Sequence, residues 1–213
     1  MVKFEKAFPR FLIPGALLLL GGNRADAHLV TTGLGPVYDG ITHFALSPDD
    51  ILPAVALALF AGLRGPLPGR RAMFMLPAAW LSGGLTSVYL ISWQSFSAPW
   101  VAGILAATFL VFGLLVASDL KLPPAAVVAL ALALGVIHGF VNGVAMTQDG
   151  ATTSVATLQL LGIAATLFIL VALVSAAVIS LRWDWTRIVV RVAGSWIAAM
   201  GLLWLGWSLR GRG

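Results

Sequence analysis

The sequence contains no cysteine and little charge. Without cysteine the chain has no disulfide, no thiolate metal ligand and no cysteine nucleophile. Charged residues make up 10% of the 213 residues, and hydrophobic residues make up 60%. A soluble domain carries about 25% charged residues. Together with a mean hydropathy of +0.98, these values predict an integral membrane protein without a separate soluble domain.

The net charge of +5 does not indicate a nucleic-acid-binding protein. The basic residues lie at the ends of apolar segments, where they orient helices in a membrane. The sequence also has no phosphate-binding glycine loop. ATP hydrolysis by this chain is therefore not expected.

The first 27 residues resemble a secretory signal peptide. Three basic residues precede the apolar run 11–20, which is too short to span a bilayer comfortably. A small-x-small site then ends at Ala27. We expect cleavage after Ala27, so that 1–27 is the signal peptide and 28–213 the transmembrane domain; the alternative is an uncleaved first helix.

The remaining chain predicts an all-α bundle of about six transmembrane helices. Leucine, alanine, valine and glycine dominate the apolar segments, without the two-residue alternation of a membrane barrel. The expected spans are 50–63, 72–92, 99–118, 124–146, 155–181 and 187–208, with a short helix at 36–46 before the first. Tryptophans near the span ends, Trp80 included, indicate interface anchors. Small residues four apart, such as Gly139 and Gly143 or Ser82 and Thr86, predict close helix packing.

The charge of the connections predicts the orientation. Seven basic residues fall in the connections after the predicted spans 50–63, 99–118 and 155–181, whereas the segments 93–98 and 147–154 have none. Basic residues mark the cytoplasmic side. The mature N-terminus is therefore expected outside, on the periplasmic side of a bacterial inner membrane, although Arg210 and Arg212 then also fall outside.

The chain has only three histidines, and each lies where a metal ion could be held. His28 would be the mature N-terminus, offering an amine and a ring nitrogen to one ion. Asp39 and His43 are four residues apart and share one face of the predicted short helix. Ionisable groups in a membrane segment are costly and mark function.

Asp49 and Asp50 follow Ser47-Pro48, which predicts a new helix with Ser47 as N-cap and Pro48 at its first position. The simpler interpretation of both acids is stabilisation of the positive helix end, which contributes only about 0.3–1 kcal/mol each. A charge at membrane depth costs about 2.5–3.5 kcal/mol. If Asp50 lies below the headgroups, capping alone does not explain it.

His138 and Asn142 repeat the four-residue spacing inside an apolar segment. The simpler interpretation is a helix-packing face with hydrogen bonds to neighbouring helices. The functional one is an imidazole that faces a polar cavity, with Asn142 as a weak or supporting ligand. The cavity could also be lined by Gln159, Thr157, Ser82 and Thr86. Imidazole and carboxylate without sulfur suit nickel, cobalt, zinc or copper.

Two motifs resemble those of the HupE/UreJ family, which is associated with nickel and cobalt uptake for hydrogenases and ureases. The family has His, five residues, then Asp-His, where this chain has His43 through Asp49-Asp50. A later family motif, Phe-His-Gly-x-Ala-His-Gly-x-Glu, corresponds to 137–145. Here Asp50, Asn142 and Ala145 replace two histidines and a glutamate, so the resemblance implies a metal site whose preferred ion has shifted.

These observations favour a secondary carrier or facilitator for a divalent transition metal ion. Ions would pass from the outside through His28, Asp39 and His43 to the inner group of Asp49, Asp50 and His138. The main alternative is a non-transporting accessory protein that binds metal for the assembly of a partner metalloenzyme. A membrane enzyme with a copper or zinc centre at His28 and His43 is a third hypothesis, but no nucleophile or base signature supports it. A purely structural subunit is a fourth.

Overall fold

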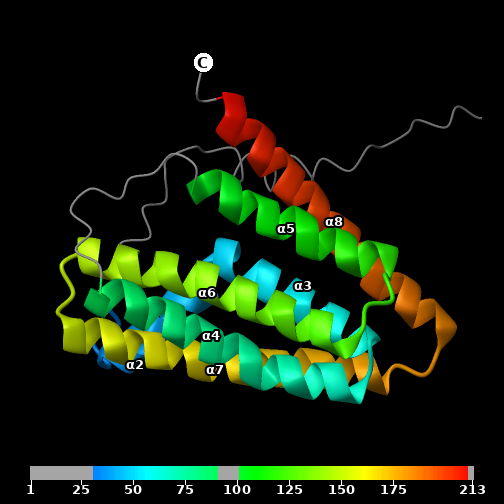
Figure 1. The fold of residues 1–213 in the computed structure, drawn as a ribbon, viewed down its shortest axis with the longest axis horizontal. Coiled ribbons are helices and arrows are strands. Elements are labelled where there is room, and N and C mark those ends of the chain that lie inside the picture. Colours follow the sequence, from blue (N-terminus) through cyan, green and yellow to red (C-terminus); the bar gives the residue numbers. More distant parts are fainter. Residues whose placement is uncertain (1–30, 91–100, 211–213) are drawn as a thin grey trace, which may run out of the picture.

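The fold is all-helical, as the composition predicts. A computed structural model describes residues 31–90 and 101–210, and these form seven helices (Figure 1). Five are long and apolar enough to cross a membrane, or six if the bent pair α2 and α3 is one span. The helices are α2 (Pro36–Leu46), α3 (Pro48–Leu63), α4 (Pro66–Leu90), α5 (Val101–Ser118), α6 (Pro124–Gln148), α7 (Thr153–Ser180) and α8 (Asp184–Arg210).

Most predicted spans match these helices to within a few residues, but α4 starts six residues earlier than expected. The prolines at positions 66 and 68 fall in its first turn, where proline is tolerated because the N–H groups have no partner within the helix. The connection after α3 is therefore only Arg64 and Gly65. Gly65 has φ +105°, a conformation that side chains rarely adopt.

Helix α3 lies at the centre of the structure. Its largest contacts are with α7 and α5, and it makes smaller contacts with α4, α6, α8 and α2. In Figure 1, α4, α6 and α7 run side by side, and α5 and α8 form a pair on the opposite side of the molecule. Side chains of α3 are thereby brought close to every other part of the bundle.

The chain bends by 76° between α2 and α3. Ser47 is the N-cap residue and Pro48 the first residue of α3, as predicted. The Ser47 hydroxyl does not cap α3, however, because it donates instead to the carbonyl oxygen of His43 at 2.7 Å. With 16 residues, α3 is about 24 Å long. It is therefore too short to cross a ~30 Å hydrocarbon core alone.

Glycines hold α4 and α6 in close contact, which confirms the packing prediction for Gly139 and Gly143 but not for Ser82 and Thr86, whose side chains are exposed. A Cβ on Gly139 would lie 1.9 Å from the Trp80 carbonyl oxygen, and one on Gly83 would lie 2.4 Å from that of Val136. Only glycine permits this approach of the two backbones. This contact places the middle of α6, with His138, directly against α4.

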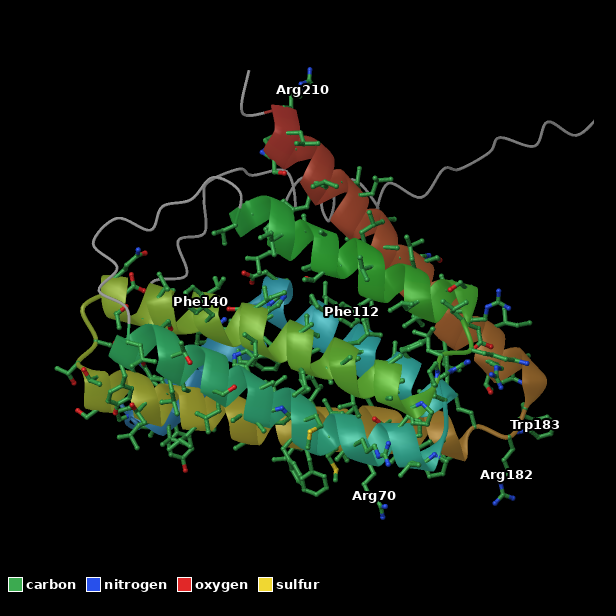
Figure 2. The ribbon with its side chains drawn as sticks, in the orientation of Figure 1. Arg70, Phe112, Phe140, Arg182, Trp183 and Arg210 are labelled. Atoms are coloured by element: carbon green, nitrogen blue, oxygen red, sulfur yellow. The ribbon has the colours of Figure 1, made fainter. Side chains whose placement is uncertain are left out.

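Three connections meet at one end of the bundle. Arg64 after α3 and Arg187 near the start of α8 both bind the carboxylate of Asp119, which follows α5. The Arg187 Nε lies 2.9 Å from Asp119 Oδ2. The basic connections therefore share one side, as their charge predicts. Figure 2 shows Arg182 and Trp183 at this end.

Candidate functional site

A cluster of buried polar side chains joins α3 to α6 in the interior. Asp50 Oδ1 lies 2.8 Å from His138 Nδ1, and Asp50 Oδ2 accepts a hydrogen bond of 2.9 Å from Asn142 Nδ2. Asp50 is 3% exposed, His138 0% and Asn142 4%. His138 lies near the middle of α6. Residues from two distant parts of the chain thus form one polar core site.

The imidazole of His138 is engaged at both nitrogens. Its Nε2 lies 3.1 Å from the hydroxyl of Thr108 on α5. That hydroxyl donates to the carbonyl oxygen of Leu105 at 2.7 Å, so it offers Nε2 a lone pair. A metal ion must therefore displace Thr108 or Asp50 to reach a ring nitrogen.

Trp80 covers one face of the His138 ring. Their ring centroids are 5.2 Å apart at an interplanar angle of 35°, and Phe44 of α2 packs edge-on against Trp80 at 5.9 Å. The expectation that Trp80 is an interface anchor is wrong, because its side chain is fully buried. Sequence reasoning also missed Thr108. Threonines in apolar helices commonly bond their own helix, so position 108 carried no signal.

Two buried atoms of this cluster lack a hydrogen-bond partner among the described residues. They are the Asn142 Oδ1 acceptor and the Trp80 Nε1 donor. An unpaired buried polar atom has a cost and points to a missing water or ion. Asn142 Oδ1, the Asp50 carboxylate and the His138 ring form the nitrogen and oxygen donor set that borderline transition metals accept.

Asp49 and His43 lie close to this cluster without joining it. Both are half-buried. Asp49 is within electrostatic range of Asp50, His138 and His43. No described residue forms a hydrogen bond with the His43 imidazole. These two side chains lie on either side of the bend between α2 and α3.

Asp39 belongs to a different environment. Its Oδ1 accepts hydrogen bonds from the backbone N–H and hydroxyl of Thr32 at 2.6 and 2.7 Å. It makes no hydrogen bond to His43 despite the four-residue spacing. Within the described ranges, no three histidine or acidic residues form a cluster for one ion. Asp39 therefore lines a pocket separate from the core cluster, and His28 lies outside the described residues.

None of the four residues expected to line a shared cavity reaches the cluster. Ser82 and Thr86 are exposed on α4 and donate to carbonyls of their own helix. Thr157 pairs with the exposed Tyr89 at 3.2 Å. Gln159 is buried, but it lies in the pocket of Asp39 and not beside His138. The periodicity of these helices was too weak to predict which face points inward.

The chain matches the family model described as HupE / UreJ protein over residues 16–204. The match covers α2 to α7 completely and most of α8. No curated protein and no solved structure is significantly similar to the chain.

Proposed function

Since this chain belongs to the HupE/UreJ family, we propose that it is a secondary carrier or facilitator for a divalent transition metal ion. The family consists of membrane permeases associated with nickel and cobalt uptake for hydrogenases and ureases. We further propose that the protein lies in a bacterial inner membrane with its mature N-terminus outside.

The observation that carries the proposal is the contact of Asp50 with His138 and Asn142. A buried carboxylate and a buried imidazole within membrane helices are costly, and packing alone does not require them. Here they come from two helices and adjoin an unpaired amide oxygen. An ion that separates Asp50 from His138 would meet a carboxylate, an imidazole and the Asn142 amide oxygen as ligands.

The donor set supports a class of ion and not one metal. The family motifs have imidazoles where this chain has Asp50 and Asn142, so oxygen replaces nitrogen at two positions. Replacing nitrogen ligands by oxygen ligands weakens the site's preference for those divalent transition metal ions that favour nitrogen ligands. We therefore propose a nickel- or cobalt-like divalent ion, with copper and zinc as the competitors to be tested.

The membrane potential is sufficient as a driving force. A divalent ion that moves inward gains roughly 4.6 kcal/mol per 100 mV, twice the value for a unit charge. This gain is comparable to the cost of breaking the contacts of His138, since hydrogen bonds to charged groups contribute about 1.5–3 kcal/mol each. Transport without ATP is therefore energetically reasonable.

One observation favours the accessory function as the second candidate. His138 is fully buried, and Trp80, Asp50 and Thr108 occupy its surroundings. A protein that only holds metal at its outer face for a metalloenzyme would have such a closed interior. It would bind metal through groups nearer the proposed outer face, such as His43 and Asp39, and would not move the ion inward.

Uptake of radioactive nickel and cobalt by proteoliposomes tests the two functions. The wild type is compared with His43→Ala and His138→Ala, and Ser87→Ala is the matched control, because Ser87 is buried but bonds only its own helix at Gly84. We expect uptake by the wild type and the control, and loss in both histidine variants. Metal binding without uptake by the wild type would favour the accessory function. Normal uptake by His138→Ala would refute the carrier site.

A further inference from the structure

A second polar site lies between α2, the α6–α7 connection and the start of α7. It is a pocket of about 620 Å³. Two carboxylates, Asp39 and Asp149, and the amide of Gln159 line it, and none of the described lining residues is basic. The other lining residues are Thr31, Gln148, Gly150, Ala151 and Val155. The lining of the pocket therefore carries negative charge, and the pocket lies at one end of the helix bundle.

Gln159 supplies an independent sign of a ligand. Its side chain is 3% exposed, and its Oε1 atom is buried without a hydrogen-bond partner among the described residues. The residue is held firmly, because Gly40 packs against its backbone: a Cβ at Gly40 would lie 2.1 Å from the Gln159 carbonyl oxygen. A fixed, buried and unpaired amide oxygen beside two acids lacks a positively charged or donating partner.

The two carboxylates also have free oxygen atoms. Thr32 occupies only Oδ1 of Asp39, and no described residue donates to its Oδ2 or to the exposed carboxylate of Asp149. Carboxylate and amide oxygens without imidazole bind hard or hydrated cations, weakly and with rapid exchange. Such a site concentrates ions but selects poorly among them.

We propose that this pocket is a vestibule that binds hydrated divalent cations ahead of the core site. The proposal rests on the carrier function given above. Asp39 lies one helical turn before His43, and His43 lies within electrostatic range of Asp49, which in turn senses His138. The pocket and the core cluster are thus the ends of one series of ionisable groups along α2 and α3.

The vestibule lies at the end of the bundle away from the basic one. The α6–α7 connection that lines it is at the opposite end of α6 from the connection with Asp119 (Figure 1). In the proposed topology this is the outer side, where ions are captured. The absence of basic residues in the pocket lining fits capture of cations.

Uptake kinetics test the vestibule at its most accessible carboxylate. We expect Asp149→Asn to raise the cobalt concentration for half-maximal uptake by roughly fivefold to tenfold. This is the effect of losing one charge near a divalent ion when solvent and salt screen the interaction. Gln148→Glu adds a charge to the lining and should lower it. Ser154→Lys changes the charge in the first turn of α7, outside the lining, and its effect should be far smaller.

A binding measurement separates failure of the vestibule from failure of the carrier function. The chain has no cysteine, so a fluorophore can be placed at Ser154→Cys beside the pocket or at Ser180→Cys at the far end of α7. Cobalt should quench the first label and not the second, and Asp149→Asn should weaken the quenching. This readout does not require uptake.

The outcomes are distinct. Quenching at position 154 without uptake would preserve the vestibule and refute the carrier. Uptake with unchanged kinetics in Asp149→Asn and Gln148→Glu, together with equal quenching of both labels, would overturn the vestibule. Equal kinetic effects of Asp149→Asn and Ser154→Lys would show general surface charge instead of a site, and would also overturn it.

Discussion

Removing the Asp50 carboxylate should destabilise the protein far more than a typical substitution. Asp50 accepts two short hydrogen bonds at 3% exposure. In Asp50→Leu, the His138 Nδ1 and one Asn142 hydrogen would lose their acceptor inside the bundle. Breaking a buried pair by removing one partner costs about 3–5 kcal/mol, because the other partner is left uncompensated. We expect a loss of this size in the free energy of unfolding.

A double-mutant cycle isolates the interaction. His138→Leu should lower the free energy of unfolding about as much as Asp50→Leu. The double variant should lower it by less than the sum of the two, since replacing both partners by apolar groups can be nearly neutral. Asn142 limits the cost in each background, because its Nδ2 also donates to the His138 carbonyl oxygen at 3.0 Å. The expected coupling is about 1.5–3 kcal/mol.

The assay is unfolding of the purified protein in mixed micelles, followed by tryptophan fluorescence. The chain has eight tryptophans, of which Trp80 packs against His138 and contributes the part of the emission that reports on the site. Asp50→Leu combined with Ser175→Ala is the control, because Ser175 bonds Val171 and Ala58 far from the cluster. The losses in unfolding free energy from Asp50→Leu and Ser175→Ala should add. If the costs of Asp50→Leu and His138→Leu also added, the buried pair would not be an energetic unit and the reasoning would be wrong.

Two further predictions concern packing and charge elsewhere in the bundle. Gly139→Ala should prevent the close contact of α4 and α6, because its Cβ would lie 1.9 Å from the Trp80 carbonyl oxygen; unfolding should become easier by about 1–3 kcal/mol. Asp119→Asn should lower the free energy of unfolding by about 3–5 kcal/mol, because it leaves Arg64, whose side chain is only 6% exposed, without its partner. Arg187→Gln should lower it by under about 1 kcal/mol, since Arg187 is half exposed. Unfolding titrations check both, and equal costs for Asp119→Asn and Arg187→Gln would contradict the second.

The helices were predictable because long apolar runs with few breaks leave little choice in a membrane. The short helix at 36–46, the break at Ser47-Pro48 and the start of α6 at Pro124 all follow local rules for proline and capping residues. The start of α4 was placed too late. Its first turns contain Arg70 and Arg71, and basic residues were taken as a loop although they fit a helix end at the interface.

The candidate site was predictable in its residues but not in its contacts. Asp50 and His138 stood out because ionisable groups are rare in apolar helices. Their contact spans 88 positions of the sequence and depends on the glycine-mediated approach of α6 and α4, together with the central position of α3. Spacing along one helix cannot predict such a contact. Conversely, the Asp39–His43 spacing predicted a shared role, but Thr32 takes the Asp39 carboxylate.

The break between α2 and α3 explains how carboxylates come to lie beside His138. A helix start inside a membrane usually leaves N–H groups without partners, at a cost of several kcal/mol each. Here Pro48 has no N–H, and the N–H groups of Asp50 and Ile51 donate to the Ser47 carbonyl oxygen.

The cost of starting a helix at this depth is thus largely removed, and the positive end of α3 favours the two acids that follow. The same features keep the resting site balanced in charge, because Asp50 faces both the helix end and the His138 ring. An incoming cation gains little until it separates this pair. Selectivity in the proposed carrier therefore depends on which ions bind Asp50 and His138 more strongly than these groups bind each other, and not on the affinity of an open site.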